Sequence, residues 1–323
     1  MTILTVLQSG YATVQDLGRA GRASVGICVN GAADSHAATT ANTLVGNRLG
    51  SALIETTGSA FSFVASADIV IAVTGAAEKV VVDGFDQPAW ETLVVPAGRH
   101  VLVEAPHRGW RCYVAINGLI EADVVLGSVA PDSLLGVGTR LLGGQELSIR
   151  SRFEGLDHPH TGVPVFRIGP SPARCAATIH VDVTPGPERD QFGHDVLDPP
   201  YEVSVSSDHV GLRASGPTPA RSDAGEILSR GVPVGAVEVP PSGGLLVLLR
   251  GRLLTAGYPV PAVATATSLD RLGQARPGST LMFRWTDTRT AVGAARDRRR
   301  ATDELGRRVA SAFRSSGIGH VLD

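Results

Sequence analysis

Charged side chains beside apolar runs are the groups in the first half of this sequence best suited to acid–base chemistry or to anion binding. Asp16 and Arg19 lie three positions apart, and a guanidinium can grip a ligand carboxylate with two hydrogen bonds. A structural ion pair in a tight turn explains the same spacing. Glu55 follows the apolar run Ala52–Ile54, so it is either paired with an arginine or an acid–base group. We take Glu55 as a catalytic candidate, and Asp16 and Arg19 as substrate-binding candidates.

Asn42 is unusual because it lies in the middle of an expected helix, beside an apolar stripe that contains Ala37, Ala41 and Leu44. A buried asparagine needs hydrogen-bond partners. Its amide therefore either holds a neighbouring loop or faces a pocket, and Asn42 joins the substrate-binding candidates.

The second half contains a cluster of acid, imidazole and base in Asp208, His209 and Arg213. Histidine suits general acid–base work near neutral pH. Adjacent side chains on a strand point to opposite faces, however, which disfavours an Asp208–His209 dyad. Asp208 is taken as a catalytic candidate and Arg213 as a substrate-binding candidate.

Two further candidates follow along the chain. Glu238 lies in an apolar strand-like run, so its carboxyl is expected to face inward or to be paired, and it is a catalytic candidate. Tyr258 supplies a hydroxyl within the Gly-containing turn Thr255–Pro259 and is a substrate-binding candidate.

The single lysine, Lys79, excludes several kinds of site. It lies between Glu78 and Val80, so no phosphate-binding loop with Gly-Lys-Ser/Thr is present, and no Ser-x-x-Lys pair of amidase or lactamase type. No lysine lies in a biotin-carrier turn, so no biotin is expected on this chain. The three cysteines and the scattered histidines lack metal-site spacing, so no metal site is expected.

Composition favours a chain of many short strands. It contains 38 Gly and 20 Pro among 323 residues, and 43% of the residues are hydrophobic. Strand-like runs recur in both halves and indicate an antiparallel barrel or sandwich; examples are 68–74, 111–116, 235–239 and 245–249.

Helices are expected at three places. One begins near Asp34 and ends at Gly46, a short one is capped by Ser268 and runs through Leu272, and an Arg-rich helix forms the tail after Thr286. The polar region 151–164 indicates a linker. We expect an N-terminal β domain at 1–155, a linker at 156–164 and a C-terminal β domain with its helical tail at 165–323.

Charge and hydropathy limit the partners and the compartment. The formal net charge is −2, so neither nucleic acid nor a membrane surface is an expected partner. The run 298–300 of three arginines fits a solvated helix face with nearby acids better than a nucleic-acid site. We find no signal-peptide pattern and no long apolar run, and the odd, scattered cysteines fit a reduced cytoplasmic protein.

Several short motifs, in this order, resemble the family of allophanate hydrolase subunit 2 and the C-type subunit of 5-oxoprolinase (PxpC, KipA-like), which is similar to the carboxyl-transferase part of urea carboxylase. They run from about residue 5 to residue 285. The matching stretches are 13–19, 31–34, 41–47, 126–128, 185–188, 207–208 with Gly211 and Arg213, 239–240 with Gly243, and 257–259.

The resemblance implies a mainly β fold of two cyclophilin-like β-barrel domains with a few short helices. It also implies a hydrolase of C–N bonds that works as one subunit of a complex. The implied partners are a KipI-like protein (allophanate hydrolase subunit 1, the B-type subunit of 5-oxoprolinase) and, in some systems, a LamB/YcsF-type third subunit. The implied cofactor is ATP with Mg²⁺, bound here or at a site shared with the partner.

The implied reaction is the ATP-dependent opening of a cyclic or acyl amide, in which ATP activates the lactam oxygen and water attacks the activated carbon. A biotin-dependent carboxyl-transferase module and a non-enzymatic, KipA-like regulator are the alternatives. This chain departs from the family pattern at Ala33, usually Met; His209, usually Arg; Glu238, usually Gln; and in 251–254, where the usual Asp, Gln and first Thr are missing.

Overall fold

The computed structural model describes residues 1–138, 140–151, 168–172, 175–223 and 225–315. The chain forms two compact units. Unit 1 comprises Met1–Gly18, Ser35–Arg174 and Arg299–Asp323, and unit 2 comprises Arg19–Asp34 and Cys175–Arg298. The linker expected at 156–164 lies outside the described residues.

Unit 1 is built from two antiparallel sheets. The first has seven strands in the order β11-β12-β1-β4-β9-β6-β7, and the second has five in the order β2-β3-β10-β5-β8. The strands are β1 Thr2–Gln8, β2 Ala12–Gln15, β3 Leu53–Thr57, β4 Phe61–Ala65, β5 Ile69–Gly75, β6 Lys79–Val82, β7 Phe85–Pro88, β8 Leu93–Val95, β9 Val101–Val103, β10 Arg111–Ile116, β11 Leu119–Ile120 and β12 Glu146–Arg150.

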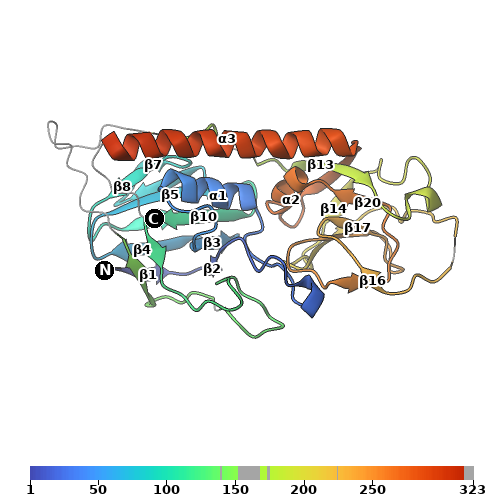
Figure 1. Ribbon diagram of the computed structural model, residues 1–323, viewed down its shortest axis with the longest axis horizontal. Coiled ribbons are helices and arrows are strands. Elements are labelled where there is room, and N and C mark those ends of the chain that lie inside the picture. The colour runs from blue at the N-terminus through green and yellow to red at the C-terminus, as the bar shows by residue number, and fades with distance from the viewer. Residues whose placement is uncertain (139, 152–167, 173–174, 224, 316–323) are drawn as a thin grey trace. The chain divides into compact units, whose positions relative to one another are not determined.

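The core of unit 1 lies around β5 and β10, in which every residue is buried. Helix α1 (Ser35–Leu44) packs on these two strands, as Figure 1 shows. Side-chain hydroxyls fix the helix there: Thr74 donates to the carbonyl of Ala37 at 2.8 Å and Thr92 to that of Leu44 at 2.8 Å. Strands buried on both faces explain why these runs are almost continuously apolar.

The helix α1 ends where the sequence predicts. Gly46 has a left-handed φ of +72°, which glycine adopts without steric cost. A Cβ on Gly46 would lie 2.9 Å from Cε2 of Phe313, a buried residue of the long helix α3 (Thr288–Ser315). Gly46 is therefore needed both for its backbone conformation and for the close approach of this ring.

Unit 2 contains a closed barrel of seven strands in the order β13-β20-β17-β18-β15-β14-β21. Apolar side chains that alternate along the strands fill it, among them Val183, Leu212, Val237 and Val247. The barrel strands are β13 Thr178–Pro185, β14 Tyr201–Val203, β15 Gly211–Ser215, β17 Ala236–Glu238, β18 Leu245–Leu248, β20 Ala262–Ala264 and β21 Thr280–Trp285. β16 Arg230–Gly231 pairs with β19 Thr255–Ala256 in a separate two-stranded sheet.

Helix α2 (Ala266–Leu272) is capped by Thr265, whose hydroxyl accepts a hydrogen bond from the backbone N–H of Ser268, so the predicted cap at Ser268 is wrong. The Ser268 hydroxyl instead accepts from the backbone N–H of Asp182 on β13 at 2.8 Å. Polar anchoring to the barrel, which the local sequence does not reveal, gives Ser268 its role.

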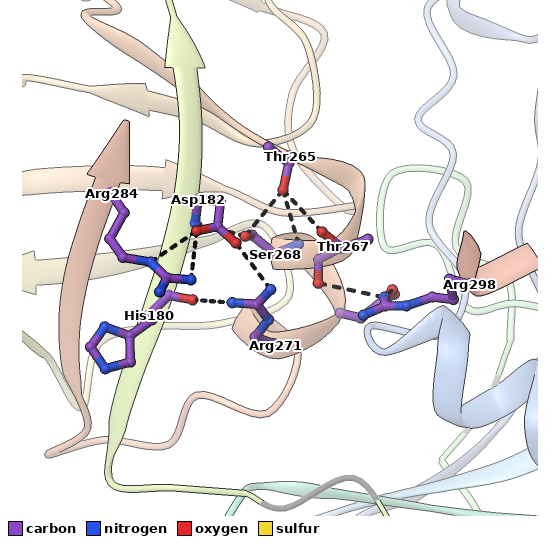
Figure 2. A network of polar contacts seen from close by, with 9 residues as sticks. His180, Asp182, Thr265, Thr267, Ser268, Arg271, Arg284 and Arg298 are labelled. Atoms are coloured by element: carbon purple, nitrogen blue, oxygen red, sulfur yellow. Dashed lines mark hydrogen bonds and ion pairs between the residues drawn. The ribbon is translucent and has the colours of Figure 1, made fainter. Parts of the chain in front are cut away.

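A polar network joins helix α2 to the barrel wall, as Figure 2 shows. The carboxylate of Asp182 accepts from Arg271 of α2 at 3.1 Å and from Arg284 of β21 at 2.9 Å. Arg298 forms an ion pair with Asp270, so one residue of the arginine run is used for structure. Two guanidiniums on one carboxylate hold the helix against two neighbouring strands.

The predicted mainly β fold is confirmed by the two sheets of unit 1 and the barrel of unit 2. The tail is helical as predicted, but α3 has 28 residues and is not short. Two 3-10 turns, Ala23–Val25 and Arg189–Gln191, complete the elements. Within the described part of the chain, none of the helices combines the length and the apolar character needed to cross a membrane.

Candidate functional site

Asp16 holds a loop of unit 1 in place. Its Oδ1 accepts from the hydroxyl of Ser128 at 2.6 Å and from the backbone N–H of Gly18 at 2.7 Å. Its Oδ2 accepts from the backbone N–H of Val129 at 2.9 Å. Both carboxylate oxygens are thus used by protein donors, which favours a structural role over a substrate contact. Arg19 belongs to unit 2, where it is 2% exposed and its backbone N–H donates to the carbonyl of Val29.

Asn42 pins the segment that follows helix α1. Its side-chain amide donates to the carbonyl of Ser51 at 2.9 Å and to that of Leu49 at 3.3 Å. Its oxygen accepts from Asn47 at 3.4 Å, and the residue is 1% exposed. Of the two roles open for Asn42, these contacts support loop anchoring.

We expect Asn42→Ala to lower the free energy of unfolding by about 1–3 kcal/mol, because the carbonyls of Leu49 and Ser51 lose their donor from a buried side chain. Urea unfolding followed by circular dichroism measures the change. Thr39→Ala on the same helix is the matched control, since the Thr39 hydroxyl donates only to the carbonyl of His36 within the helix. Equal midpoints for the two variants would show that Asn42 does not anchor this segment.

Glu55 and Arg111 form a buried ion pair across neighbouring strands of unit 1. The carboxylate of Glu55 lies 3.5 Å from Nε of Arg111, and the two side chains are 9% and 7% exposed. The register places Glu55 opposite Tyr113, two residues from Arg111 on β10. Glu55 is thus paired with an arginine, one of the two roles expected from the sequence.

The barrel of unit 2 brings Arg213 and Glu238 onto one face. Leu246 of β18 pairs with Arg213 of β15 on one side and with Glu238 of β17 on the other. The neighbours Leu212 and Val237 point into the barrel, so the three residues of this row point outward. Two predicted candidates, 25 positions apart in sequence, therefore lie about 10 Å apart across three adjacent strands.

Glu238 is enclosed although it lies on the outer face. It is 1% exposed, and its Oε1 has no hydrogen-bond partner among the described residues. Beside it, Val232 and Ala256 pack in a small apolar cluster with Ala236 and Leu246. Burial raises the pKa of Glu238 to about 7, and the charge of Arg230 opposes this shift. This carboxyl can therefore exchange a proton near neutral pH.

A second carboxylate next to this site behaves in the opposite way. Arg230 forms an ion pair with Glu188, and the backbone N–H of Val260 donates to the same oxygen of Glu188 at 2.8 Å. Burial alone raises the pKa of Glu188, but these two hydrogen bonds outweigh it and bring the pKa below its ordinary value. Glu188 thus stays ionised at pH values at which Glu238 is still partly protonated, a separation typical of acid–base sites.

A pocket of about 390 Å³ opens on the barrel beside Arg213. Its remaining lining comes from β15, the segments on either side of it, the loop that precedes β18 and the first residue of β18. The lining residues are Ser204, Ser206, Arg213, Ala214, Ser215, Gly216, Thr218, Pro240, Ser242, Gly243, Gly244 and Leu245.

Two other site candidates, Asp208 and Tyr258, do not line this pocket. The Oδ1 of Asp208 accepts from the backbone N–H groups of Val210 and Gly211 at 2.8 and 3.1 Å, so the carboxylate shapes the turn before β15. Tyr258 is 40% exposed. It precedes Pro259, whose carbonyl accepts from the backbone N–H of Val239, next to Glu238. Tyr258 is therefore near this strand, whereas Asp208 is committed to its turn.

Glu188 and Arg230 were not among the site candidates from the sequence. Glu188 lies in the rigid Gly/Pro run Pro185–Glu188, one of the family-like stretches, which was the available signal for it. No local sequence signal pointed to Arg230, because its contact with Glu188 spans 42 positions. Among the described residues, no three His, Cys, Asp or Glu side chains come together as a metal-ligand set.

Comparison with known proteins places this chain in a family. Residues 25–285 match the family described as "Carboxyltransferase domain, subdomain A and B". The chain is 30% identical over 319 residues to the C-type subunit of 5-oxoprolinase from Escherichia coli (strain K12), an alignment that covers 95% of this chain and 99% of that protein.

Solved structures show the same fold. The crystal structure of TTHA0988 is similar with a TM-score of 0.76 and 31% sequence identity, over 88% of this chain and 56% of that chain. The K. lactis urea amidolyase is similar with a TM-score of 0.82 and 22% identity, over 94% of this chain and 20% of that chain. This chain therefore spans just over half of the first protein and a fifth of the second.

Proposed function

Because this chain belongs to the carboxyltransferase family of subdomains A and B, we propose that it is one subunit of an amidohydrolase of the 5-oxoprolinase or allophanate hydrolase type. Its near full-length similarity to a protein named as a 5-oxoprolinase subunit supports this assignment. The substrate is a small cyclic or acyl amide. The partners are a KipI-like, subunit 1 protein and, in some systems, a LamB/YcsF-type third subunit.

The observation that carries the proposal is the enclosed carboxyl of Glu238. Opening an amide with water requires a group that takes a proton from the attacking water. With a pKa of about 7, Glu238 is ionised in part at neutral pH and can act as this base. The Gln usual in the resembling family has no ionisable carboxyl, so this proton transfer would be particular to chains that carry Glu at this position. Because Glu238 is only 1% exposed, proton transfer also requires a local opening of the protein that lets water reach the carboxyl.

ATP with Mg²⁺ activates the amide in the proposed reaction. Nothing among the described residues marks a site for such a group on this chain. No three His, Cys, Asp or Glu side chains come together among them, and Lys79 is engaged by Asp86 at 2.9 Å and lies 3.8 Å from Glu104. We therefore assign the nucleotide to a partner subunit or to a site shared with it, and water activation to this chain.

The test is reconstitution. This chain, its partner subunits, ATP and 5-oxoproline are expected to release glutamate, and Glu238→Gln is expected to lower kcat about 100-fold or more. Glu202→Gln, an exposed carboxylate of the same barrel, is the matched control and should retain activity. Wild-type activity in Glu238→Gln would remove Glu238 from the reaction. No glutamate from the complete wild-type set would reject the proposed function.

Carboxyl transfer is the second candidate, because the description of the matched family favours it. The biotin would be carried by another chain, since Lys79 lies in a strand pair and not in a carrier turn. Decarboxylation of free carboxybiotin by this chain would support it. Partner binding without either activity would instead indicate the third alternative, a KipA-like regulator.

A further inference from the structure

The pocket beside Arg213 is walled by groups that donate hydrogen bonds. Hydroxyls come from the four serines Ser204, Ser206, Ser215 and Ser242 and from Thr218, and no acidic residue is among the described residues that line it. Gly216, Gly243 and Gly244 also line it, and a Cβ on Gly243 would lie 2.9 Å from the hydroxyl oxygen of Thr218. Its volume of about 390 Å³ lies in the range of small-molecule sites.

The backbone of Arg213 is held by hydrogen bonds, while its side chain is exposed and lines the pocket. Ser207 accepts from the backbone N–H of Arg213 at 3.0 Å and donates to its carbonyl at 3.2 Å, and the N–H of Ser204 donates to the same carbonyl at 2.8 Å. Its side chain has no ion pair or hydrogen bond with any residue that the structure describes. An uncompensated guanidinium among hydroxyls is the arrangement that recognises oxyanions.

Hydroxyl groups along the wall are already oriented. The Oγ atoms of Ser204 and Ser206 lie 2.9 Å apart, and Ser204 Oγ also accepts from the backbone N–H of Ser206. Thr218 Oγ1 accepts from the backbone N–H of Gly244 at 3.3 Å, which leaves its own proton free to donate. Donors fixed before a ligand arrives lower the entropy cost of binding it.

We propose that this pocket binds the oxyanion of a small molecule, with Arg213 as the charged partner and the hydroxyls as neutral donors. This inference deepens the proposed function, on which it rests for the source of the anion: the carboxylate of a lactam acid or a phosphoryl group. Because Arg213 and Glu238 lie on one face about 10 Å apart, a ligand anchored here lies on the side of the barrel that carries the acid–base group.

Isothermal titration of the chain alone distinguishes the two sources. The probes are 5-oxoproline, 2-pyrrolidinone, which is the same ring without a carboxylate, and inorganic phosphate. Binding of 5-oxoproline but not of 2-pyrrolidinone assigns the pocket to a carboxylate. Binding of phosphate alone assigns it to a phosphoryl group. If none of the three binds to the wild-type chain, the inference is wrong, whereas the proposed function is judged separately by glutamate release.

Variants test whether Arg213 is the anchor. We expect Arg213→Gln to weaken binding of the anion at least about ten-fold, and Arg213→Lys to have an intermediate effect because it keeps the charge but loses the forked geometry. Arg284→Gln removes the same charge from the barrel outside the pocket and should change affinity less than about two-fold. Equal losses in Arg213→Gln and Arg284→Gln would show only general charge attraction and would overturn the inference.

Discussion

Replacing Glu238 by Gln is expected to stabilise the protein at pH 8 by about 3 kcal/mol and to leave its stability almost unchanged at pH 4. Folding raises the pKa of this carboxyl from an ordinary value of 4.5 to about 7. Between these values the folded state binds more protons than the unfolded state, so the stability of the wild type falls as the pH rises. Gln resembles the protonated form of the carboxyl and stays neutral, so no charge has to be buried in the variant as the pH rises.

Urea unfolding of wild type and variant between pH 4 and pH 9 measures this difference. The two curves of stability against pH should coincide below pH 4.5 and separate until about pH 7. Glu202→Gln on β14 is the control, because replacing an exposed carboxylate should not separate the two curves of stability against pH. Parallel curves for wild type and Glu238→Gln across the whole range would mean that Glu238 ionises normally.

Truncating Glu55 to Ala is expected to lower the free energy of unfolding by about 3–5 kcal/mol, because it leaves the guanidinium of Arg111 buried without its carboxylate. Thermal and urea unfolding measure the loss. Glu121→Ala removes the acid of an ion pair of similar length, 3.4 Å from Arg150, in which both side chains are largely exposed. That control should cost less than about 1 kcal/mol.

Comparing Glu55→Ala with Glu55→Gln separates structure from chemistry. Gln keeps the shape and one oxygen acceptor, so a structural role predicts a smaller loss of stability and intact glutamate release in the reconstituted system. A folded Glu55→Gln variant without activity would instead return Glu55 to the catalytic candidates. A loss in Glu55→Ala no larger than in Glu121→Ala would contradict the buried ion pair.

Local patterns predicted the elements well. The apolar run 68–74 became β5, and Arg111–Ile116 became β10 with the same bounds. Helix α1 follows its stripe, and Gly46 ends it with a positive φ. These features depend on periodicity and on the conformational freedom of glycine, both of which act within a few residues.

The roles of the site candidates depend on contacts between distant segments, which local sequence patterns do not reveal. The roles of Asp16, Asn42 and Glu55 each stayed open because the partners Ser128, Ser51 and Arg111 are distant or lie beyond the local turn. The row that joins Arg213 to Glu238 depends on the register of three strands around Leu246. Strand register is set by the whole barrel, so no single segment reveals it.

Direct titration of the Glu238 carboxyl tests the central claim, that this chain holds an acid–base group poised for amide chemistry. Carbon-13 labelling of glutamate side chains, with the signal assigned by its loss in Glu238→Gln, reports protonation by NMR. We predict a midpoint near pH 7 for this one carboxyl. A midpoint close to 4.5 would contradict the claim, because Glu238 would then be a fully ionised carboxylate with no proton to exchange at neutral pH.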